Sequence, residues 1–447
     1  MTLVAPSSPS SPPLPGSHPA IDVGVRVAGQ DAEALLRDHG SPLYVYDLDV
    51  ISDRVALLRA ALPDAVDLAF AVKANPSPAI LRHLASLGLG ADIASAGELA
   101  TVTRAGFDMR HVIFTGPGKT DAELAAAIRA GVRGITIESL EELEVMLDMA
   151  PLAGRHQGLV LRLTAEEMSR GAEGTPIIGA GGASKFGLLR AELDEAVDRL
   201  LLAGAIGGPG SPYALLGLHA FGASNVRVAD RLVEGVRWVA DQAEAVAREH
   251  GQRFRLLDAG GGLGIPYADD EAPLDVTQLG RGIADEIASW GGRVGLGEAR
   301  LLLEPGRYVV GPAGAYLTRV VRTKSRGGRT MAITDGGIHH LLRPALVGEA
   351  QRIVAVGDAA SRTARTPSSV VGPLCTGLDM LAAEVSLPEP RTGDVLAVLD
   401  AGAYGFTESM PLFLSHPVPA EVVVSGGIAR VARLRQEPTT GPSASIW

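Results

Sequence analysis

The sequence predicts an α/β architecture, in which a closed (β/α)8 barrel is followed by a C-terminal β-rich domain. Eight short apolar segments alternate with amphipathic helical patterns over about 250 residues, which is a usual length for such a barrel. No G-x-G-x-x-G turn follows the first segment, which disfavours the rival prediction of an open doubly wound sheet. After Arg307 the helical periodicity mostly disappears and strand-like segments take its place.

Each barrel element is predicted from its apolar pattern. The expected strands are at residues 66–73, 91–94, 111–115, 134–138, 159–164, 214–221, 254–259 and 300–304. Helical patterns lie at residues 51–62, 78–87, 97–105, 121–130, 140–149, 191–203, 227–250 and 277–290. In the second domain, strands are expected at residues 318–322, 330–334, 353–356, 395–399 and 421–424.

These patterns divide the chain of 447 residues into four parts. Residues 1–20 form a Ser- and Pro-rich tail that we expect to be disordered. Residues 21–47 carry short strands that should pack with the β-rich domain, which spans residues 306–447, and the barrel spans residues 48–305. A Gly-rich insert at residues 165–186 should form a loop over the barrel mouth.

Composition excludes several classes of protein. The net charge of −11, without a basic block, argues against nucleic acid or an anionic membrane as partner. Cys375 is the only cysteine, so no internal disulfide can form, which fits a reducing cytoplasm. The sequence contains no apolar run long enough to span a bilayer, and the tail lacks the features of a signal peptide.

Polar residues collect where the predicted strands end, which is where barrel enzymes place their active sites. The residues at these ends are Lys73, Asp92, His219, Phe221, Ser224, Asn225, Asp258, Gly260, Gly261, Gly262, Glu304 and Arg307. Each has an ordinary alternative: Lys73 as a solvated strand cap, the glycines as a tight turn, and Glu304 as a surface partner of Arg307. However, Glu304 follows an apolar strand, so it should be partly buried and should need a cationic partner.

Taken together, these groups form one chemical set. A lysine amine can form a Schiff base, a buried carboxylate can pair with a protonated ring nitrogen, and Gly, Ser and Arg can hold a phosphate. Pyridoxal 5′-phosphate needs these groups, so it is the expected cofactor, and we assign no metal ligands.

The sequence resembles the alanine-racemase-fold decarboxylases that use this cofactor, the group of diaminopimelate and ornithine decarboxylases. The resemblance covers residues 40 to 428. The matching motifs are Phe70-Ala-Val-Lys-Ala-Asn75, Asp92-Ile-Ala-Ser95 with Gly97-Glu-Leu99, Lys185-Phe-Gly187, Gly260-Gly-Gly262, Glu304-Pro-Gly-Arg307, Asp335-Gly-Gly337, Gly372-Pro-Leu-Cys375 with Asp379, and Asp400-Ala-Gly-Ala-Tyr-Gly405.

The resemblance implies a role for each site residue. Lys73 would bind the cofactor covalently, Asp92 would belong to the cofactor site, and Glu304 would keep the pyridine nitrogen protonated. The phosphate would be lined by Ser224, Gly261, Gly262, Arg307 and Tyr404. The protein would be a homodimer in which Cys375 of the other subunit, carried by the β-rich domain, returns a proton after CO2 leaves. The alternative for Cys375 is a small buried hydrophobe.

Three departures from the family concern the substrate. Thr376 stands where diaminopimelate decarboxylases have a glutamate, and Val347 follows the substrate arginine, Arg343, where they have a tyrosine. Phe221 replaces the histidine that stacks on the cofactor ring; a phenyl ring can stack but supplies neither proton nor charge. Losing these polar contacts should weaken recognition of a free amino-acid head group. The pattern is more similar to relatives in antibiotic biosynthesis that act on an amino acid tethered to an acyl carrier protein.

The leading hypothesis is therefore a decarboxylase of a tethered aspartyl- or glutamyl-type residue. The alternatives are diaminopimelate decarboxylase of lysine biosynthesis, a non-catalytic relative that binds pyridoxal phosphate or a partner, and a racemase. Carrier proteins are acidic, so docking would need a local basic patch. Arg322, Lys324, Arg326 and Arg329 are candidates, although the tip of a solvated hairpin is the favoured explanation of this cluster.

Overall fold

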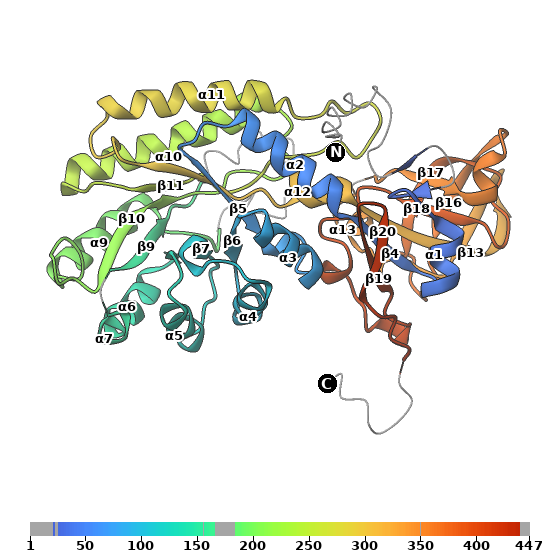
Figure 1. Ribbon diagram of the computed structural model, residues 1–447, viewed down its shortest axis with the longest axis horizontal. Helices are drawn as coiled ribbons and strands as arrows, with labels where there is room; N and C mark the ends of the chain where they lie inside the picture. The colour runs from blue at the N-terminus through green and yellow to red at the C-terminus, as the bar shows by residue number, and fades with distance from the viewer. Residues whose placement is uncertain (1–20, 23–25, 155, 166–183, 349, 439–447) are drawn as a thin grey trace, which may run out of the picture.

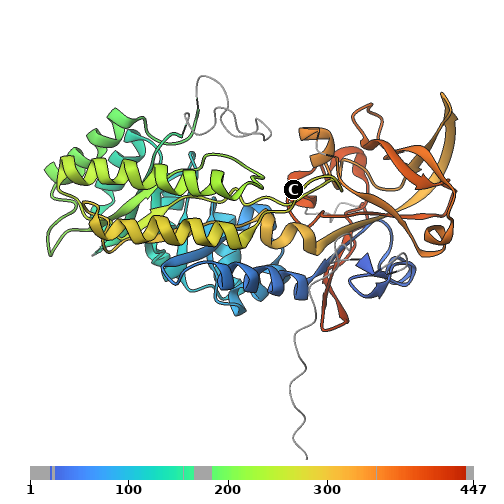
Figure 2. The same cartoon turned by 90° about the horizontal axis from the view of Figure 1, so that it is seen from above.

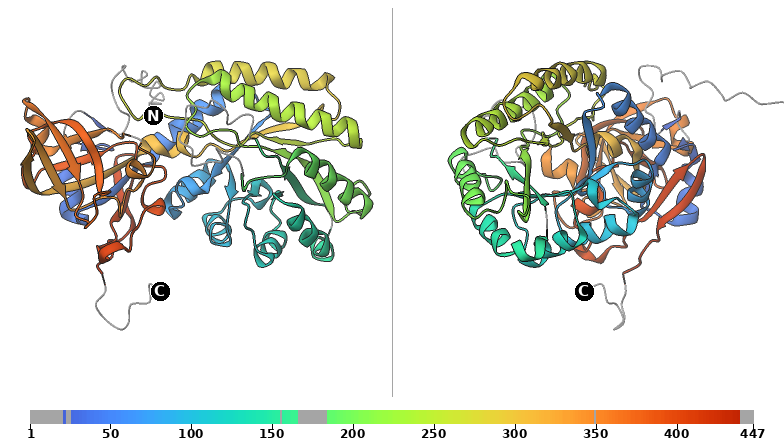
Figure 3. Two further views of the ribbon diagram at one scale, coloured as in Figure 1. Left: turned by 180° about the vertical axis from the view of Figure 1, so that it is seen from behind. Right: turned by 60° about the vertical axis from the view of Figure 1, so that its left-hand side comes forward.

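The computed structural model describes residues 21–22, 26–154, 156–165, 184–348 and 350–438. Eight parallel strands close into a barrel in which the last strand pairs with the first, Leu301 opposite Val66. Figure 3 shows this barrel partly end-on, with helices around its outside. The barrel strands are β5 (Val66–Ala71), β6 (Gly90–Ile93), β7 (Val112–Phe114), β8 (Gly134–Ile137), β9 (Gln157–Arg162), β10 (Tyr213–His219), β11 (Leu256–Asp258) and β12 (Arg300–Leu303).

Amphipathic helices cover the barrel. Several begin at a side chain that accepts a backbone N–H of the first turn, as Ser95, Thr120 and Ser139 do. The helices are α2 (Leu48–Ala61), α3 (Pro78–Ser86), α4 (Ala96–Ala105), α5 (Asp121–Ala130), α6 (Leu140–Asp148), α7 (Ala150–Ala153), α9 (Arg190–Leu202), α10 (Ala229–His250), α11 (Val276–Ser289) and α12 (Arg307–Val310). The predicted barrel is thus confirmed, with element ends displaced by a few residues.

One displacement affects the predicted site. The first strand ends at Ala71, and Val72–Ala74 form a 3-10 turn, so Lys73 lies just beyond the strand and not in it. The carbonyl of Ala74 accepts the backbone N–H of Tyr404 at 2.8 Å, which ties this turn to the β-rich domain. The strand therefore ends two residues earlier than its apolar pattern indicates, where the chain contacts the second domain.

The second domain is a nine-stranded sheet. Its main path runs β17-β16-β14-β13-β4-β19-β20, with β18 pairing β13 and β15 pairing β18. The strands are β4 (Leu43–Asp47), β13 (Gly314–Arg326), β14 (Arg329–Thr334), β15 (Ile353–Val356), β16 (Arg365–Val371), β17 (Met380–Pro388), β18 (Val395–Val398), β19 (Ala420–Ser425) and β20 (Ile428–Arg433). The N-terminal strand β4 lies between β13 and β19, so a segment that precedes the barrel completes the domain that follows it.

Some elements have no counterpart in the sequence prediction. These are helix α1 (Ala32–His39), the short helix α13 (Arg343–Val347) and strands β16, β17 and β20. The short strands expected at residues 21–47 include β1 (Ile21–Asp22), β2 (Arg26–Val27) and β3 (Gln30–Asp31), which form a small sheet of their own. The prediction at residues 1–20, and most of the predicted loop at 165–186, lie outside the described residues. Among the described helices, none is long and apolar enough to cross a membrane.

The two domains lie side by side, as Figures 1 and 2 show from two directions, and their buried side chains form a shared core. One cluster of buried side chains contains both Phe70 of the barrel and Tyr316 and Leu396 of the sheet. The Asn75 side chain donates to the carbonyl of Gly402 at 2.8 Å, and Ser77 Oγ donates to Glu421 at 3.1 Å. The carboxyl end of β5 therefore faces the β-rich domain, which places the predicted site at the junction.

Candidate active site

Lys73 lies at this junction beside a buried carboxylate. Its Nζ is 3.0 Å from Oδ2 of Asp92, which projects from β6 and is 2% exposed, whereas half of the lysine side chain is exposed. Burial disfavours the ammonium charge, but the negative charges of Asp92 and Glu304 outweigh it and raise the pKa of Lys73. Asp92 thus holds the amine in place at the barrel mouth.

Glu304 follows β12 and is 3% exposed. Its backbone N–H donates to the carbonyl of Gly260 at 2.8 Å, which joins the ends of β11 and β12. Within the described part of the chain, its Oε1 has no hydrogen-bond partner. Burial, and then the nearby charge of Asp258, raise the pKa of the Glu304 carboxyl, so this side chain needs a cation or a donor to be ionised.

The Gly260-Gly-Gly262 turn has no room for side chains. A Cβ on Gly261 would lie 2.4 Å from the carbonyl oxygen of Glu304, and one on Gly262, where φ is +90°, would lie 2.4 Å from that of Ala223. The three strand ends that carry these residues therefore approach each other through bare backbone. Such a turn can present N–H groups to an anion.

Arg307 provides the positive charge next to this turn. It is 4% exposed, and its guanidinium donates to Tyr267 Oη at 2.5 Å and to Ser224 Oγ at 3.3 Å. The guanidinium carbon also lies 4.9 Å from the centre of the Tyr404 ring. Arg307, Ser224 and Tyr404 thus come together next to the strand ends that carry the glycine turn. Tyr267 was missed, because nothing in its local sequence indicates that it contacts Arg307.

Phe221 lies at the same mouth, just after β10. It is half-buried, and a Cβ on Gly260 would lie 2.8 Å from its Cδ2, so the ring rests against the glycine turn. This places an aromatic ring beside the glycine turn at the barrel mouth.

The predicted substrate arginine joins the cluster from the second domain. Arg343 begins α13, is buried, and lies 4.7 Å from the centre of the Tyr404 ring. It also forms an ion pair with Glu408 at 3.1 Å. Val347, half-buried, ends the same short helix.

Cys375 and Thr376 lie elsewhere in the chain, on the loop between β16 and β17. Cys375 is exposed and Thr376 is half-buried. Asp379 shapes this loop, because its carboxylate accepts the N–H groups of Leu374 and Ile338 at 2.7 and 2.8 Å. The loop thus presents Cys375 outward from the β-rich domain.

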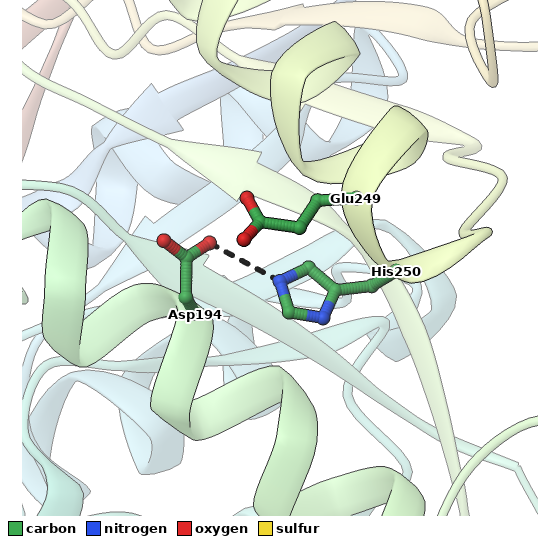
Figure 4. Close-up of side chains that lie close together, drawn as sticks. All are labelled: Asp194, Glu249 and His250. Carbon is green, nitrogen blue, oxygen red and sulfur yellow. Dashed lines mark hydrogen bonds and ion pairs between the residues drawn. The ribbon is translucent and has the colours of Figure 1, made fainter.

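A second polar cluster lies outside the barrel, between α9 and α10 (Figure 4). His250 Nε2 is 3.2 Å from Asp194, and Arg190 pairs with both Asp194 and Glu249 at 3.0 and 3.1 Å. The arginine balances the carboxylates, so this group is an ion-pair network that joins two helices.

A further ion pair lies at the ends of β8 and β9. Glu138 pairs with Arg162 at 2.8 Å, both are buried, and the sequence prediction did not include them. Glu138 also accepts the backbone N–H groups of Gly116 and Gly187 at 2.8 and 3.3 Å. These contacts join the ends of β8 and β9 at the barrel mouth.

The arrangement fits pyridoxal phosphate on two observations. Glu304 Oε1 is buried and meets no hydrogen-bond donor among the described residues. The glycine turn, which has no room for side chains, lies beside a buried arginine. An amine at a barrel strand end, a buried carboxylate and a glycine turn beside an arginine are the groups that pyridoxal phosphate needs, so the arrangement defines a pyridoxal phosphate-dependent barrel enzyme.

The comparisons with known proteins give the family. The model for the pyridoxal-binding domain of pyridoxal-dependent decarboxylases matches residues 48–311, and the chain belongs to this family. The protein is therefore a pyridoxal phosphate-dependent amino-acid decarboxylase.

The chain is similar to several named relatives over nearly its whole length. It is 34% identical to diaminopimelate decarboxylase of Methanothermobacter thermautotrophicus over 92% of each chain. It is 29% identical to the L-glutamyl-[BtrI acyl-carrier protein] decarboxylase of Niallia circulans over 90% of this chain and 92% of that one. The crystal structure of diaminopimelate decarboxylase from Helicobacter pylori complexed with L-lysine superposes with a TM-score of 0.80 and 26% identity, over 91% of this chain and 97% of that one.

A substitution in the Gly260-Gly-Gly262 turn tests whether the turn contributes to cofactor binding. We expect Gly261→Ala to push the turn away from Glu304, because its Cβ would lie 2.4 Å from a backbone oxygen. Overpacking costs about 1–3 kcal/mol, so cofactor affinity should fall by about tenfold or more. Titration of the chain with pyridoxal phosphate measures this. Gly118→Ala, which meets no atom within 4 Å, is the matched control, and equal affinities in the two variants would refute a tight cradle.

Proposed function

We propose that the protein removes the α-carboxyl group of an aspartyl- or glutamyl-type residue that is tethered to an acyl carrier protein, in the biosynthesis of a natural product. The observation that carries this proposal is the ion pair between Arg343 and Glu408. The guanidinium that would hold a free distal carboxylate already has an anionic partner in the chain.

Three departures from the family pattern also support a tethered substrate. Thr376, Val347 and Phe221 are uncharged, whereas a free diaminopimelate head group brings both an ammonium and a carboxylate into the site. A site rejects a charged group for which it offers no partner, because the group would lose its hydration without compensation. A tethered residue carries an acyl linkage instead of that carboxylate. The similarity to the Niallia circulans enzyme also supports this substrate class.

In this proposal the barrel residues bind and orient the reactants. Lys73 would hold the cofactor covalently through its amine, and Asp92 would position Nζ of the lysine. Glu304 would pair with the ring nitrogen, and Phe221 would pack against the ring. When bound, pyridoxal phosphate supplies a ring that accepts the electrons left behind as CO2 departs.

The phosphate and the final proton are assigned to different parts of the protein. Ser224, Gly261, Gly262, Arg307 and Tyr404 hold the phosphate, with Tyr267 orienting Arg307. Cys375 is exposed on its own domain, so we assign it to the site of a second copy of the chain, where its thiol returns a proton to the substrate carbon. This arrangement requires a homodimer with shared sites.

Diaminopimelate decarboxylation is the second candidate, favoured by 34% identity to the Methanothermobacter enzyme. One experiment separates the two. The loaded protein is incubated with free meso-diaminopimelate, free glutamate and aspartate, and glutamyl- and aspartyl-loaded carrier proteins, and loss of CO2 is followed by mass spectrometry. We expect turnover only with a loaded carrier. Brisk turnover of free diaminopimelate would make the tethered substrate wrong.

The hairpin of β13 and β14 is the proposed docking point for the carrier. Arg322, Lys324 and Arg326 are exposed there, and Arg329 pairs with Glu384 at 2.6 Å. Because carrier proteins are acidic, we expect Lys324→Glu with Arg326→Glu to raise KM for the loaded carrier about tenfold at low salt while kcat is kept. Arg281→Glu, at an exposed position of α11, is the control. An equal KM in both variants, at any salt concentration, would exclude the hairpin.

A further inference from the structure

Three ionisable side chains meet inside the barrel at consecutive strand ends. His219 ends β10, Asp258 ends β11, and Glu304 follows β12. His219 and Asp258 are direct neighbours in the parallel ladder, and Asp258 is opposite Leu302, two residues before Glu304. Side chains that differ by two positions share a face, so all three point into the barrel. One nitrogen or oxygen of each lies within 4.8 Å of the others.

The three side chains are buried and incompletely paired. Their exposed fractions are 1%, 0% and 3% for His219, Asp258 and Glu304. Within the described residues, both ring nitrogens of His219, Oδ2 of Asp258 and Oε1 of Glu304 have no hydrogen-bond partner. Asp258 and Glu304 can share a hydrogen bond only while one of the two carboxyls is protonated, and the ring nitrogens of His219 stay unpaired. Proteins pair nearly all buried polar groups, so this cluster indicates that something completes it.

The charges around the cluster decide what can complete it. Burial, and then the charges of Arg162, Lys73 and Lys119, lower the pKa of His219, so the imidazole is neutral and offers one N–H donor and one acceptor. Burial raises the pKa of Asp258 and of Glu304, and the charge of Asp92 adds to both effects. The two carboxylates can be ionised together only if a further cation enters between them.

The cofactor of this family brings such a cation, the protonated nitrogen of its pyridine ring. We propose that Asp258 acts with Glu304 as a second counter-charge for the ring nitrogen, and that His219 is a positioning residue that donates a hydrogen bond to Asp258. Asp258 Oδ1 already accepts the N–H of Gly260 at 2.8 Å. Oδ2 makes no hydrogen bond with His219 in this structure, although one polar atom of each residue lies within 4.8 Å of the other, so the proposed hydrogen bond is one that forms in the loaded enzyme. Two carboxylates hold the ring proton to a higher pH than Glu304 does alone.

The chain offers a graded set of variants. Asp258→Asn removes the charge and keeps an oxygen for the Gly260 N–H. His219→Phe removes the donor, whereas His219→Gln keeps one. Glu304→Gln is the positive control. Thr136→Val, which removes a buried hydroxyl 3.3 Å from Thr115 on the other side of the barrel, is the control for loss of a buried polar group.

The test measures the ring nitrogen directly and needs no substrate. Each variant is loaded with cofactor labelled with 15N in the ring, and the 15N chemical shift, which reports protonation of that nitrogen, is followed from pH 6 to pH 9. We expect the ring nitrogen of wild type, His219→Gln and Thr136→Val to stay protonated. Asp258→Asn and His219→Phe should lose the proton at a pH lower by about one unit or more.

Several results would overturn the proposal. A titration of Asp258→Asn like that of the wild type, while Glu304→Gln loses the proton, excludes Asp258 as a counter-charge. Equal behaviour of His219→Phe and His219→Gln excludes the donor role of His219. If His219→Phe does not fold, as circular dichroism would reveal, the near-isosteric Asp258→Asn still decides the first part. The outcome is independent of which substrate the enzyme uses.

Discussion

Lys73→Ala is expected to abolish the covalent link between protein and cofactor and to lower turnover by a factor on the order of 10⁴ or more. Lys73 is the lysine held at the barrel mouth, 3.0 Å from Asp92 and within the fields of Asp92 and Glu304. Without its amine, borohydride reduction should attach no cofactor to the protein, and the visible absorbance of the linked form should be missing. Absorbance, mass spectrometry after borohydride reduction and CO2 release measure these three effects.

The control is Lys73→Arg, which keeps a cation beside Asp92 and cannot form the link. Any loss of fold stability through an unpaired Asp92 should therefore appear in the alanine variant only, whereas both variants should lose activity. Decarboxylation at the wild-type rate in either variant would refute the assignment of Lys73. A wild-type protein without the absorbance band, unchanged by the substitution, would indicate a non-catalytic relative.

The barrel could be predicted because its strands and helices carry strong local signals. A strand such as Leu301-Leu-Leu303 is buried on both faces and is followed by polar residues, and the helices between such strands keep their apolar periodicity. The strands that the prediction missed carry weaker signals. None of the β20 residues is buried, and β16 contains Pro367 and two serines, so neither strand shows a continuous apolar pattern. Their pairing with neighbouring strands determines their structure.

The candidate site was predictable to the extent that its residues directly follow strands. Lys73, Asp92 and Glu304 could be placed together, because the ends of barrel strands meet. The contacts of Arg343 with Glu408 and of Arg307 with Tyr267 join segments 65 and 40 positions apart, and no spacing rule predicts them. The incomplete pairing of His219 was also beyond the sequence, since it depends on which neighbours fail to reach its ring.

The last prediction tests whether two chains share each active site. Lys73 lies at the barrel mouth, whereas Cys375 is exposed on the far domain. If each site takes Lys73 from one chain and Cys375 from the other, then Lys73→Ala and Cys375→Ala are both expected to be nearly inactive as homodimers. Mixing them through denaturation and refolding produces heterodimers in which one of the two sites carries both native residues. Random pairing makes half of the dimers mixed, so the mixture should recover roughly a quarter of wild-type turnover.

Two further measurements test whether Cys375 acts as the proton donor. Cys375→Ala alone should bind pyridoxal phosphate normally, since Cys375 donates a proton and holds no part of the cofactor in the proposal; loss of cofactor would instead indicate a structural cysteine. Cys375→Ser is the matched variant that retains a weaker proton donor, and it should be faster than Cys375→Ala. If the mixture stays inactive although light scattering shows dimers, each site is built from a single chain, and the exposed loop that carries Cys375 must then reach the site of its own barrel.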